Sequence, residues 1–433
     1  MSAIEIKAKQ NSLSALQILG LNTIRELETD LGILASGRQE IYGCIFGRDS
    51  LLTALKLLRA YERTGDSYLL ALVKKVLANL SQLQGRTVNI ESGEQPGKCI
   101  HEYRPFGHEH LTRRSNLPWY LYEDGIMRNY DSVDSTPLLL IAINRYWQLS
   151  GDQEFLSAML PTVYAALEWI VFYGDSNGDG FVDYIFPPQR KYGGLITQSW
   201  MDSGESLFHE DGSPVPYPIA PVEIQGYVYL ALKLWSNYFK NTNQAYADSL
   251  ASKSQALKSA FNDKYVLHAK GEVSLAFALD GHGNPLTATR SSMGHCLWAA
   301  LRPDLDGELD SILDVTLAAK LVDRLLRPDL FEPLAGIRTL SANSPHFDAF
   351  SYHNGSIWPH DNGLIVEGFE NFGFNAEARL VRQAFSAAVG HFQTPIELFA
   401  YFNGKYGEWC SPEGQKACRQ QAWSAATLLA ESL

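Results

Sequence analysis

Residues 48 to 84 read RDSLLTALKLLRAYERTGDSYLLALVKKVLANLSQLQ. Apolar residues recur at helical spacing on both sides of Thr64-Gly65-Asp66, which predicts one helix over 48–64 and another over 66–84. Because the connection between them is so short, the two helices must be antiparallel neighbours. This stretch therefore indicates a helical hairpin as the structural unit.

The same pattern continues through the chain. Further short connections join helical stretches at Ser150-Gly151-Asp152, Asn241-Thr242, 302–307 and Phe372-Gly373-Phe374. Long connections separate the hairpins, notably 85–131, 174–219, 263–289, 327–355 and 392–414. Twelve helices are predicted in all, over 8–30, 48–64, 66–84, 132–150, 153–173, 220–240, 243–262, 290–302, 308–326, 356–372, 375–391 and 415–431.

The alternation of short and long connections returns the elaborated loops to one end of the helices. Six such hairpins can close into a double ring, an all-α (α/α)6 barrel or six-hairpin toroid with a funnel at one rim. An open helical solenoid is the alternative, but its repeats keep a nearly constant period, whereas these loops vary strongly in length. Because no linker rich in Pro, Gly and Ser interrupts the 433 residues, we expect a single barrel domain over 1–433.

Charge and composition narrow the class of ligand. The formal net charge is −12, and nucleic acids and anionic membranes both require clustered Lys and Arg, so neither is expected as a partner. A neutral ligand fits better. Aromatic residues make up 12% of the chain, which suits a large core and stacking against carbohydrate equally.

The cysteines and the N-terminus indicate the compartment. The five cysteines are odd in number, widely spaced and without a Cys-x-x-Cys pair, so we predict reduced thiols. The N-terminus lacks the basic and apolar regions of a signal peptide, and no later apolar run is expected to be long enough to span a bilayer. We therefore expect a cytoplasmic enzyme. The sequence does not indicate its oligomeric state.

The loop-like segment Gln198 to Ser206 places an indole, Trp200, beside the carboxylic acid Asp202. An aromatic side chain there can stack on a sugar ring and desolvate the acid, which raises its pKa. Hydrolysis of a glycoside also needs a second carboxylate across the scissile bond, and the best candidate is Glu397. Glu205 is a further acid close to Asp202, so the acid is left open between these two, and Glu205 is also expected to contact substrate.

Other polar and aromatic clusters fall in the long loops or at helix starts. Arg48 and Asp49 open the second helix, and local sequence alone favours a capping role with the arginine paired nearby. Asp131 or Ser132, followed by Pro137, suits the start of the next long helix. The segment 352–362 is richer in polar and aromatic groups than a cap requires. If these groups are buried they need partners, and a ligand with many hydroxyls could supply them.

Two segments resemble metal sites. Residues 175–183, DSNGDGFVD, imitate the opening of a calcium loop, but Phe186 stands where an EF-hand places its bidentate Glu. A tight turn is therefore favoured over a bound cation. His108-Glu109-His110 lies among basic residues without a third ligand nearby. We predict no catalytic metal, and since the chain has no phosphate-cradling glycine loop, no cofactor.

Five motifs together resemble a known family. They are Phe-Gly-Arg-Asp-Ser at 46–50, His-Glu at 101–102, Trp-Met-Asp at 200–202, His-Asn-Gly-Ser-Ile-Trp-Pro-His-Asp-Asn at 353–362 and Gln-Ala-Trp-Ser at 421–424. These motifs resemble the amylo-α-1,6-glucosidase domain of glycogen debranching enzymes and, more distantly, glucoamylases. The resemblance covers nearly the whole chain in the expected order. It implies an (α/α)6 barrel and hydrolysis with inversion that releases glucose from an α-linked end.

The resemblance also implies roles for single residues. Asp202 is similar to the general acid of the family and Glu397 to the general base. Arg48 and Asp49 resemble the pair that holds hydroxyls of the sugar at the cleaved end. The other implied substrate contacts are the pocket walls Trp200, Trp358 and His360 and the hydroxyl contacts His101 and Glu102.

The resemblance leaves the substrate open. Debranching enzymes carry additional N-terminal sequence or a transferase half, whereas this chain begins almost directly with the barrel, so an oligosaccharide and a small α-glucoside are both possible substrates. Two other functions are alternatives: a glycoside phosphorylase on the same barrel, and a carbohydrate-binding protein without turnover. Glu397 disfavours the phosphorylase, because attack by phosphate needs no base.

Overall fold

The computed structural model describes residues 13–269 and 271–431. All twelve predicted helices are present within these ranges, although residues 8–12 of the first predicted helix lie outside them. The helices are α2 (Ala15–Leu27), α3 (Gly47–Thr64), α4 (Ser67–Gln82), α6 (Ser135–Ser150), α7 (Gln153–Phe172), α8 (Val222–Phe239), α9 (Gln244–Lys264), α10 (Met293–Trp298), α12 (Val315–Leu325), α13 (Pro359–Asn371), α14 (Asn375–Phe392) and α15 (Ala422–Glu431). Shorter helical turns are α5 (Glu109–Thr112), α11 (Pro303–Asp306) and the 3₁₀ turn Gly204–Ser206.

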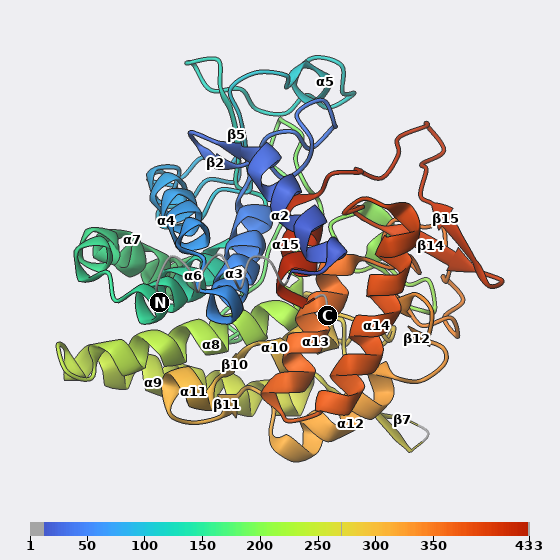
Figure 1. Cartoon of the computed structure of the whole chain (residues 1–433). Helices are drawn as coiled ribbons and strands as arrows, with labels where there is room; N and C mark the ends of the chain where they lie inside the picture. Colours follow the sequence, from blue (N-terminus) through green and yellow to red (C-terminus); the bar gives the residue numbers. More distant parts are fainter. Residues whose placement is uncertain (1–12, 270, 432–433) are drawn as a thin grey trace.

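The helices form two concentric layers, as the sequence predicts (Figure 1). Neighbours in the inner ring contact one another in the order α3, α6, α8, α10, α13 and α15, and the ring closes between α15 and α3. Each inner helix also packs against one outer helix, in the pairs α3–α4, α6–α7, α8–α9, α10–α12, α13–α14 and α15–α2. The fold is an (α/α)6 barrel.

The short connections have the local chemistry that a tight helical hairpin needs. Gly65 ends α3 in the left-handed region at φ 71°, and the Asp66 carboxylate accepts the N–H of Tyr68 to cap α4. The next hairpin repeats this solution: Gly151 has φ 68° and Asp152 caps α7. A glycine followed by a capping acid therefore reverses the chain within a few residues.

Two predicted helices are shorter in the structure than the periodicity suggests. The helix expected over 290–302 is α10, and the helix expected over 308–326 is α12. Residues between them pair instead as the antiparallel strands β10 (Ala300–Leu301) and β11 (Asp310–Ser311). Cross-strand hydrogen bonds thus replace the last turn of one helix and the first turn of the other.

The starts of two inner helices were also predicted too early. Neither Asp131 nor Ser132 begins α6, which is preceded by Asp134. The helix expected from residue 415 begins only at Ala422, because the chain before it is extended and the N–H of Gln421 is donated to the carbonyl of Pro395. Both differences lie on the rim where the long loops gather.

Short antiparallel strands order these long loops. The three-stranded sheet aligns Phe46 with Glu102 and Glu102 with Asn129, so loops from three parts of the chain meet beside the start of α3. The strands are β1 (Glu28–Thr29), β2 (Gly32–Ile33), β3 (Ile45–Phe46), β4 (Glu102–Arg104), β5 (Met127–Asn129), β6 (Ala220–Pro221), β7 (Val266–Ala269), β8 (Glu272–Leu275), β9 (Ala278–Leu279), β12 (Phe331–Glu332), β13 (Gly336–Ile337), β14 (Phe399–Phe402) and β15 (Lys405–Glu408), with β10 and β11 above.

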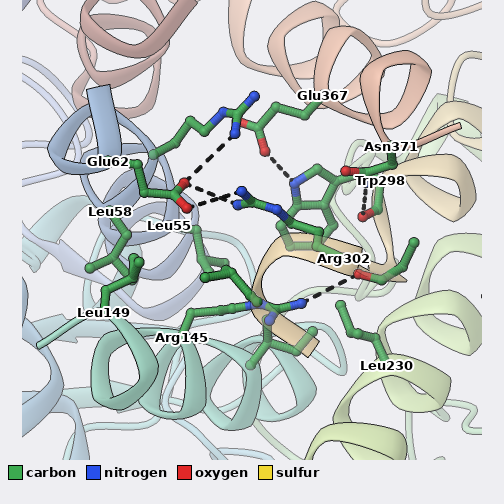
Figure 2. Close-up of a pocket in the computed structure, with 14 residues that line it drawn as sticks. Leu55, Leu58, Glu62, Arg145, Leu149, Leu230, Trp298, Arg302, Glu367 and Asn371 are labelled. Atoms are coloured by element: carbon green, nitrogen blue, oxygen red, sulfur yellow. Dashed lines mark hydrogen bonds and ion pairs between the residues drawn. The ribbon is translucent and has the colours of Figure 1, made fainter. Parts of the chain in front are cut away.

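Ion pairs line a pocket near the C-terminal ends of inner helices (Figure 2). Arg302 donates both terminal nitrogens to the carboxylate of Glu62 at 3.0 Å each. Trp298 donates its indole N–H to Glu367, and Arg145 donates to Asp306. This network of paired charges lies at the end of the barrel opposite the helix starts.

The helix α7 corrects the expectation that no apolar run in the chain is long enough to span a bilayer. By length and composition it is apolar enough to cross a membrane, and it is the one such helix in the described part of the chain. Core helices of soluble proteins pass the same test, and α7 packs against α6 and α4 in the barrel.

All five cysteines are free thiols, as the spacing predicts.

Candidate active site

A cleft opens at the N-terminal ends of three inner helices. Its empty space, counted out to the open mouth, is about 390 Å³. Its lining residues are Tyr42, Phe46, Arg48, Asp49, His101, Trp200, Asp202, Tyr352, His353, Trp358, Glu397, Gln421 and Trp423. Seven of the ten predicted site residues are therefore brought together: Arg48, Asp49, His101, Trp200, Asp202, Trp358 and Glu397.

Within the described part of the chain, Arg48 is the only lysine or arginine that lines the cleft, and all three of its guanidinium nitrogens have partners. It pairs with Asp134 through Nε and with Asp202 through Nη1 at 2.9 Å, and it donates Nη2 to the carbonyl of Ser199. The expectation of a locally paired arginine in a cap is therefore wrong. Phe46 precedes α3 without a side-chain cap, and the partners of Arg48 come from distant loops.

Asp49 faces the cleft from the first turn of α3. Burial raises its pKa to about 8, although neighbouring Arg48 opposes the rise. Its Oδ1 accepts a hydrogen bond from the amide of Gln421 at 3.1 Å. A carboxyl group in this state is largely protonated at neutral pH and can both donate and accept hydrogen bonds.

Asp202 is held in a loop with several anchors. Ser206 donates its hydroxyl to the carbonyl of Met201 at 2.6 Å, and the Ser203 hydroxyl lies 2.7 Å from Nδ1 of His353. Burial raises the pKa of Asp202, while the ion pair with Arg48 lowers it. The effect of burial is the larger one, so the pKa of Asp202 is raised and its carboxyl group can hold a proton more readily.

Glu397 is almost fully buried, with 1% of its surface exposed. One carboxylate oxygen accepts the hydroxyl of Tyr352, and the other accepts the N–H of Cys418 at 2.8 Å. Burial raises the pKa of Glu397 to about 7, and these two donors limit the rise. Glu397 is therefore an oriented group that titrates near neutral pH.

Aromatic rings form the floor and walls of the cleft. Trp200 stacks on His295 at 5.5 Å and meets Trp358 edge to face. The His295 ring is itself fixed, because its nitrogens lie 2.6 Å from the hydroxyl of Tyr227 and 2.8 Å from Oδ1 of Asp361. The apolar faces are thus rigid and suited to stacking against a sugar ring.

Comparison with known proteins shows the family of the chain. The profile of the amylo-alpha-1,6-glucosidase family matches residues 106–430. The chain belongs to this family. No curated protein matches the sequence at a significant level.

Solved structures share the fold of this family member at low sequence identity. The GH63 mannosylglycerate hydrolase from Thermus thermophilus in complex with Tris and D-glycerate superposes with a TM-score of 0.65 at 13% identity, covering 96% of this chain and 99% of that chain. The same enzyme in complex with glucose gives 0.63 at 14% identity with the same coverage. A further structure described as a glycosidase gives 0.56 at 13% identity, covering 99% of this chain and 97% of that chain.

Three predicted substrate contacts do not line the cleft of this glucosidase-family protein. Glu102 is buried next to the cleft and pairs with Arg104. Glu205 is exposed, and its backbone carbonyl, rather than its carboxylate, accepts a bond from Asn354. His360 lies behind the wall, stacked on Trp423 at 3.8 Å.

Several lining residues were not predicted. Tyr352, His353, Gln421 and Trp423 fall in segments that the sequence singles out, so their motifs carried a signal. Tyr42 carried none. Its hydroxyl oxygen lies 3.3 Å from that of Tyr352, and this contact joins parts of the chain 310 residues apart.

The two metal-like segments have local hydrogen-bonding roles. The Asp175 carboxylate accepts the N–H groups of Gly178, Asp179 and Gly180, as in a tight turn. The ring nitrogens of His108 lie within hydrogen-bond distance of Thr112 and of the carbonyl of Gly125. Within residues 13–269 and 271–431, no group of three or more His, Cys, Asp or Glu is arranged to hold a metal.

Proposed function

We propose that this chain is an inverting glycoside hydrolase that releases glucose from α-linked glucosides. The observation that carries the proposal is the pair Asp202 and Glu397, two carboxylic acids that line one aromatic cleft and reach it from separate loops. Their surroundings differ, because Asp202 pairs with Arg48 whereas Glu397 accepts two neutral donors. Different surroundings allow two acids to take different roles.

In the proposed reaction Asp202 donates its proton to the glycosidic oxygen as the bond from C1 to that oxygen breaks. Glu397 accepts a proton from the attacking water, whose oxygen bonds to C1 from the opposite face. An α-glucoside and water thus give β-glucose and the free leaving group. Tyr352 and the N–H of Cys418 keep the Glu397 carboxylate oriented toward the water.

The remaining lining groups suit recognition of one glucose ring. Asp49 offers a carboxyl group, and His101 has an Nδ1 without a partner among the described residues, so both can bind sugar hydroxyls. Trp200 and Trp358 supply apolar faces. Such faces also favour the positive charge that develops on the sugar in the transition state.

The charge of the cleft supports an uncharged leaving group. Arg48 is the only Lys or Arg among the described residues of its walls, and it is committed to two carboxylates and a carbonyl. A mannosylglycerate hydrolase of the same fold has been solved with D-glycerate, but among the residues that the structure describes no free lysine or arginine lines the cleft to pair with such a carboxylate. We therefore propose a sugar or polyol as the leaving group.

The test replaces each acid by its amide. General acid or base catalysis contributes about 10²- to 10⁴-fold, so Asp202→Asn and Glu397→Gln should each lose at least about 10²-fold in kcat while remaining folded. Fluoride needs little protonation to leave, so Asp202→Asn should be partly rescued on α-glucosyl fluoride and Glu397→Gln should not.

Glu205→Gln is the matched control, because its carboxyl group lies outside the cleft. If Asp202→Asn keeps nearly full activity and Glu205→Gln instead shows the loss that α-glucosyl fluoride rescues, then Glu205 and not Asp202 is the general acid. Formation of glucose 1-phosphate in place of free glucose when phosphate is added would instead establish the phosphorylase. Binding of saccharides without any turnover would identify a carbohydrate-binding protein.

A further inference from the structure

A second cavity lies behind the loop that carries Asp202. It encloses about 690 Å³ counted to its mouth and is lined by the segment after α4, by α7 and by the loop that follows α7. Its walls combine aromatic and polar side chains, among them Trp169, Tyr184, Lys98 and Asp183. The proposed reaction uses none of these residues.

Lys98 is an unusual member of this lining. Only 5% of its surface is exposed, yet among the described residues it forms no ion pair with a carboxylate. Its ammonium lies 3.4 Å from the carbonyl of Gly93 and 5.8 Å from the centre of the Trp169 ring. Burial lowers the pKa of Lys98 to about 8. A buried cation with so few partners is costly to the folded state, and a ligand that accepts a hydrogen bond from it would offset part of that cost.

Asp183 complements Lys98 in the same cavity. It is 5% exposed, and its Oδ2 accepts the N–H of Ser176 at 3.0 Å. Its Oδ1 is buried and has no partner in the described part of the chain. Burial raises the pKa of Asp183 to about 7, so the group can act as donor or acceptor at neutral pH.

A neighbouring ion pair is structural by contrast. Arg190 donates to Asp131 at 2.7 Å and to the carbonyl of Gly193 at 2.7 Å. A Cβ atom at Gly194 would stand 2.1 Å from each side chain of this pair, and one at Gly93 would stand 2.3 Å from Asp131. The backbone therefore packs directly against the pair, which leaves Lys98 and Asp183 as the groups open to a ligand.

The cavity shares two walls with the catalytic cleft. Gln198 lines the cavity, while Trp200 and Asp202 in the same segment line the cleft. Val133 lines the cavity and donates its N–H to the carbonyl of Gln198 at 3.1 Å. The adjacent Asp134 holds Arg48, so a ligand in the cavity would contact both segments that position the proposed acid.

We propose that this cavity binds a second, uncharged saccharide unit, with its hydroxyls accepting from Lys98 and donating to Asp183. Hydroxyl groups can satisfy both residues at once, and the aromatic walls suit a sugar face. An anion fits less well, because the carboxylates of Glu94, Asp131 and Asp183 outnumber the cations on these walls and Arg190 is already paired.

The test counts glucose-binding sites rather than turnover and asks which of them depends on Lys98, so a failure of the cavity to bind is distinguished from a failure of the cleft. D-Glucose is titrated calorimetrically into Glu397→Gln and into the double variant Glu397→Gln/Lys98→Met. Two sites are expected in the first and one in the second. Glu397→Gln/Lys191→Met is the matched control, because Lys191 is exposed on the loop after α7, and it should keep both sites.

Further variants and ligands separate a binding role from a structural one. Replacing an unpaired buried charge by an apolar side chain is neutral or stabilising, so Lys98→Met should unfold at the same or a higher temperature without ligand. Asp183→Asn, which preserves shape, should weaken the second site at least about 10-fold. Inorganic phosphate should not compete for it.

Three results would overturn the proposal. They are a number of glucose sites that Lys98→Met leaves unchanged, the loss of a site in Lys191→Met, and displacement of glucose from the second site by phosphate. A single site in Glu397→Gln that Lys98→Met abolishes would instead count against glucose binding in the cleft. Loss of catalysis in every α-glucoside assay would count against the proposed function alone.

Discussion

The hydroxyl of Tyr352 should control the pH at which the proposed base becomes active. A hydrogen bond donated to a carboxylate favours its ionised form, and Tyr352 donates one to the nearly buried Glu397. The change Tyr352→Phe removes this donor and leaves the ring, whose contacts with Trp358 and Trp409 fix its position. It should therefore raise the pKa of Glu397 without unfolding the site.

The size of the effect follows from the strength of such a bond. A hydrogen bond to a charged group contributes about 1.5–3 kcal/mol, which corresponds to a displacement of the acidic limb by about 1–2 pH units. Because the pKa of Glu397 is about 7, roughly half of it is ionised at pH 7. After the change only about 1–10% would be, so kcat/KM at pH 7 should fall roughly 5- to 50-fold and recover as the pH rises.

The assay is the pH profile of glucose release by the wild type, Tyr352→Phe and Tyr42→Phe. Tyr42 is the matched control, because its hydroxyl oxygen lies 3.3 Å from that of Tyr352 while Glu397 takes its own bonds from Tyr352 and Cys418. An acidic limb that stays in place or moves to lower pH in Tyr352→Phe would refute the reasoning. An equal displacement in Tyr42→Phe would show that the hydroxyl acts through general polarity.

Three further predictions concern substrate, stability and metals. Among the described residues of the cleft walls, the only Lys or Arg is Arg48, which is already paired. Glucosylglycerol should therefore be hydrolysed with a kcat/KM at least about 10-fold higher than that of glucosylglycerate. Equal values for these two substrates would contradict the uncharged leaving group. Arg302→Met breaks the half-buried pair with Glu62 and should lower the free energy of unfolding in urea by about 1–3 kcal/mol with kcat/KM unchanged. Activity should survive exhaustive chelation, since the Asp175 carboxylate is occupied by backbone N–H groups; a loss that calcium alone restores would contradict this.

The architecture could be predicted because its determinants are local. A helical hairpin needs apolar periodicity and a turn, and the turns at Gly65 and Gly151 each lie within three residues of sequence. The helix starts on the rim were harder. The last inner helix does not begin at residue 415, because extended residues there bond to the loop that carries Glu397, and such long-range pairing has no periodic signal.

The residues of the candidate site also divide into those that sequence motifs predict and those whose roles depend on contacts with distant parts of the chain. Arg48 was interpreted as a local capping partner because sequence reasoning weighs near neighbours, whereas its carboxylate partners are 86 and 154 residues away. Motif resemblance placed Asp202 and Glu397 in one site, as the shared cleft now does. It could not find Tyr42, whose contacts depend wholly on how two loops meet.

The polarity of the inner ring explains how one rim of the barrel can bury so many acids in and around the cleft. Four carboxylates lie at or beside the first turns of inner helices: Asp49 on α3, Asp134 before α6, Glu223 on α8 and Asp361 on α13. Helix N-terminal ends carry partial positive charge that stabilises nearby anions. Six inner helices that start at one rim therefore offset part of the cost of burying acids there. Loops can then supply Asp202 and Glu397 to the cleft, although Arg48 is the only lysine or arginine among the described residues of its walls. We therefore expect the sugar to be recognised through hydroxyl contacts and aromatic faces rather than through charge.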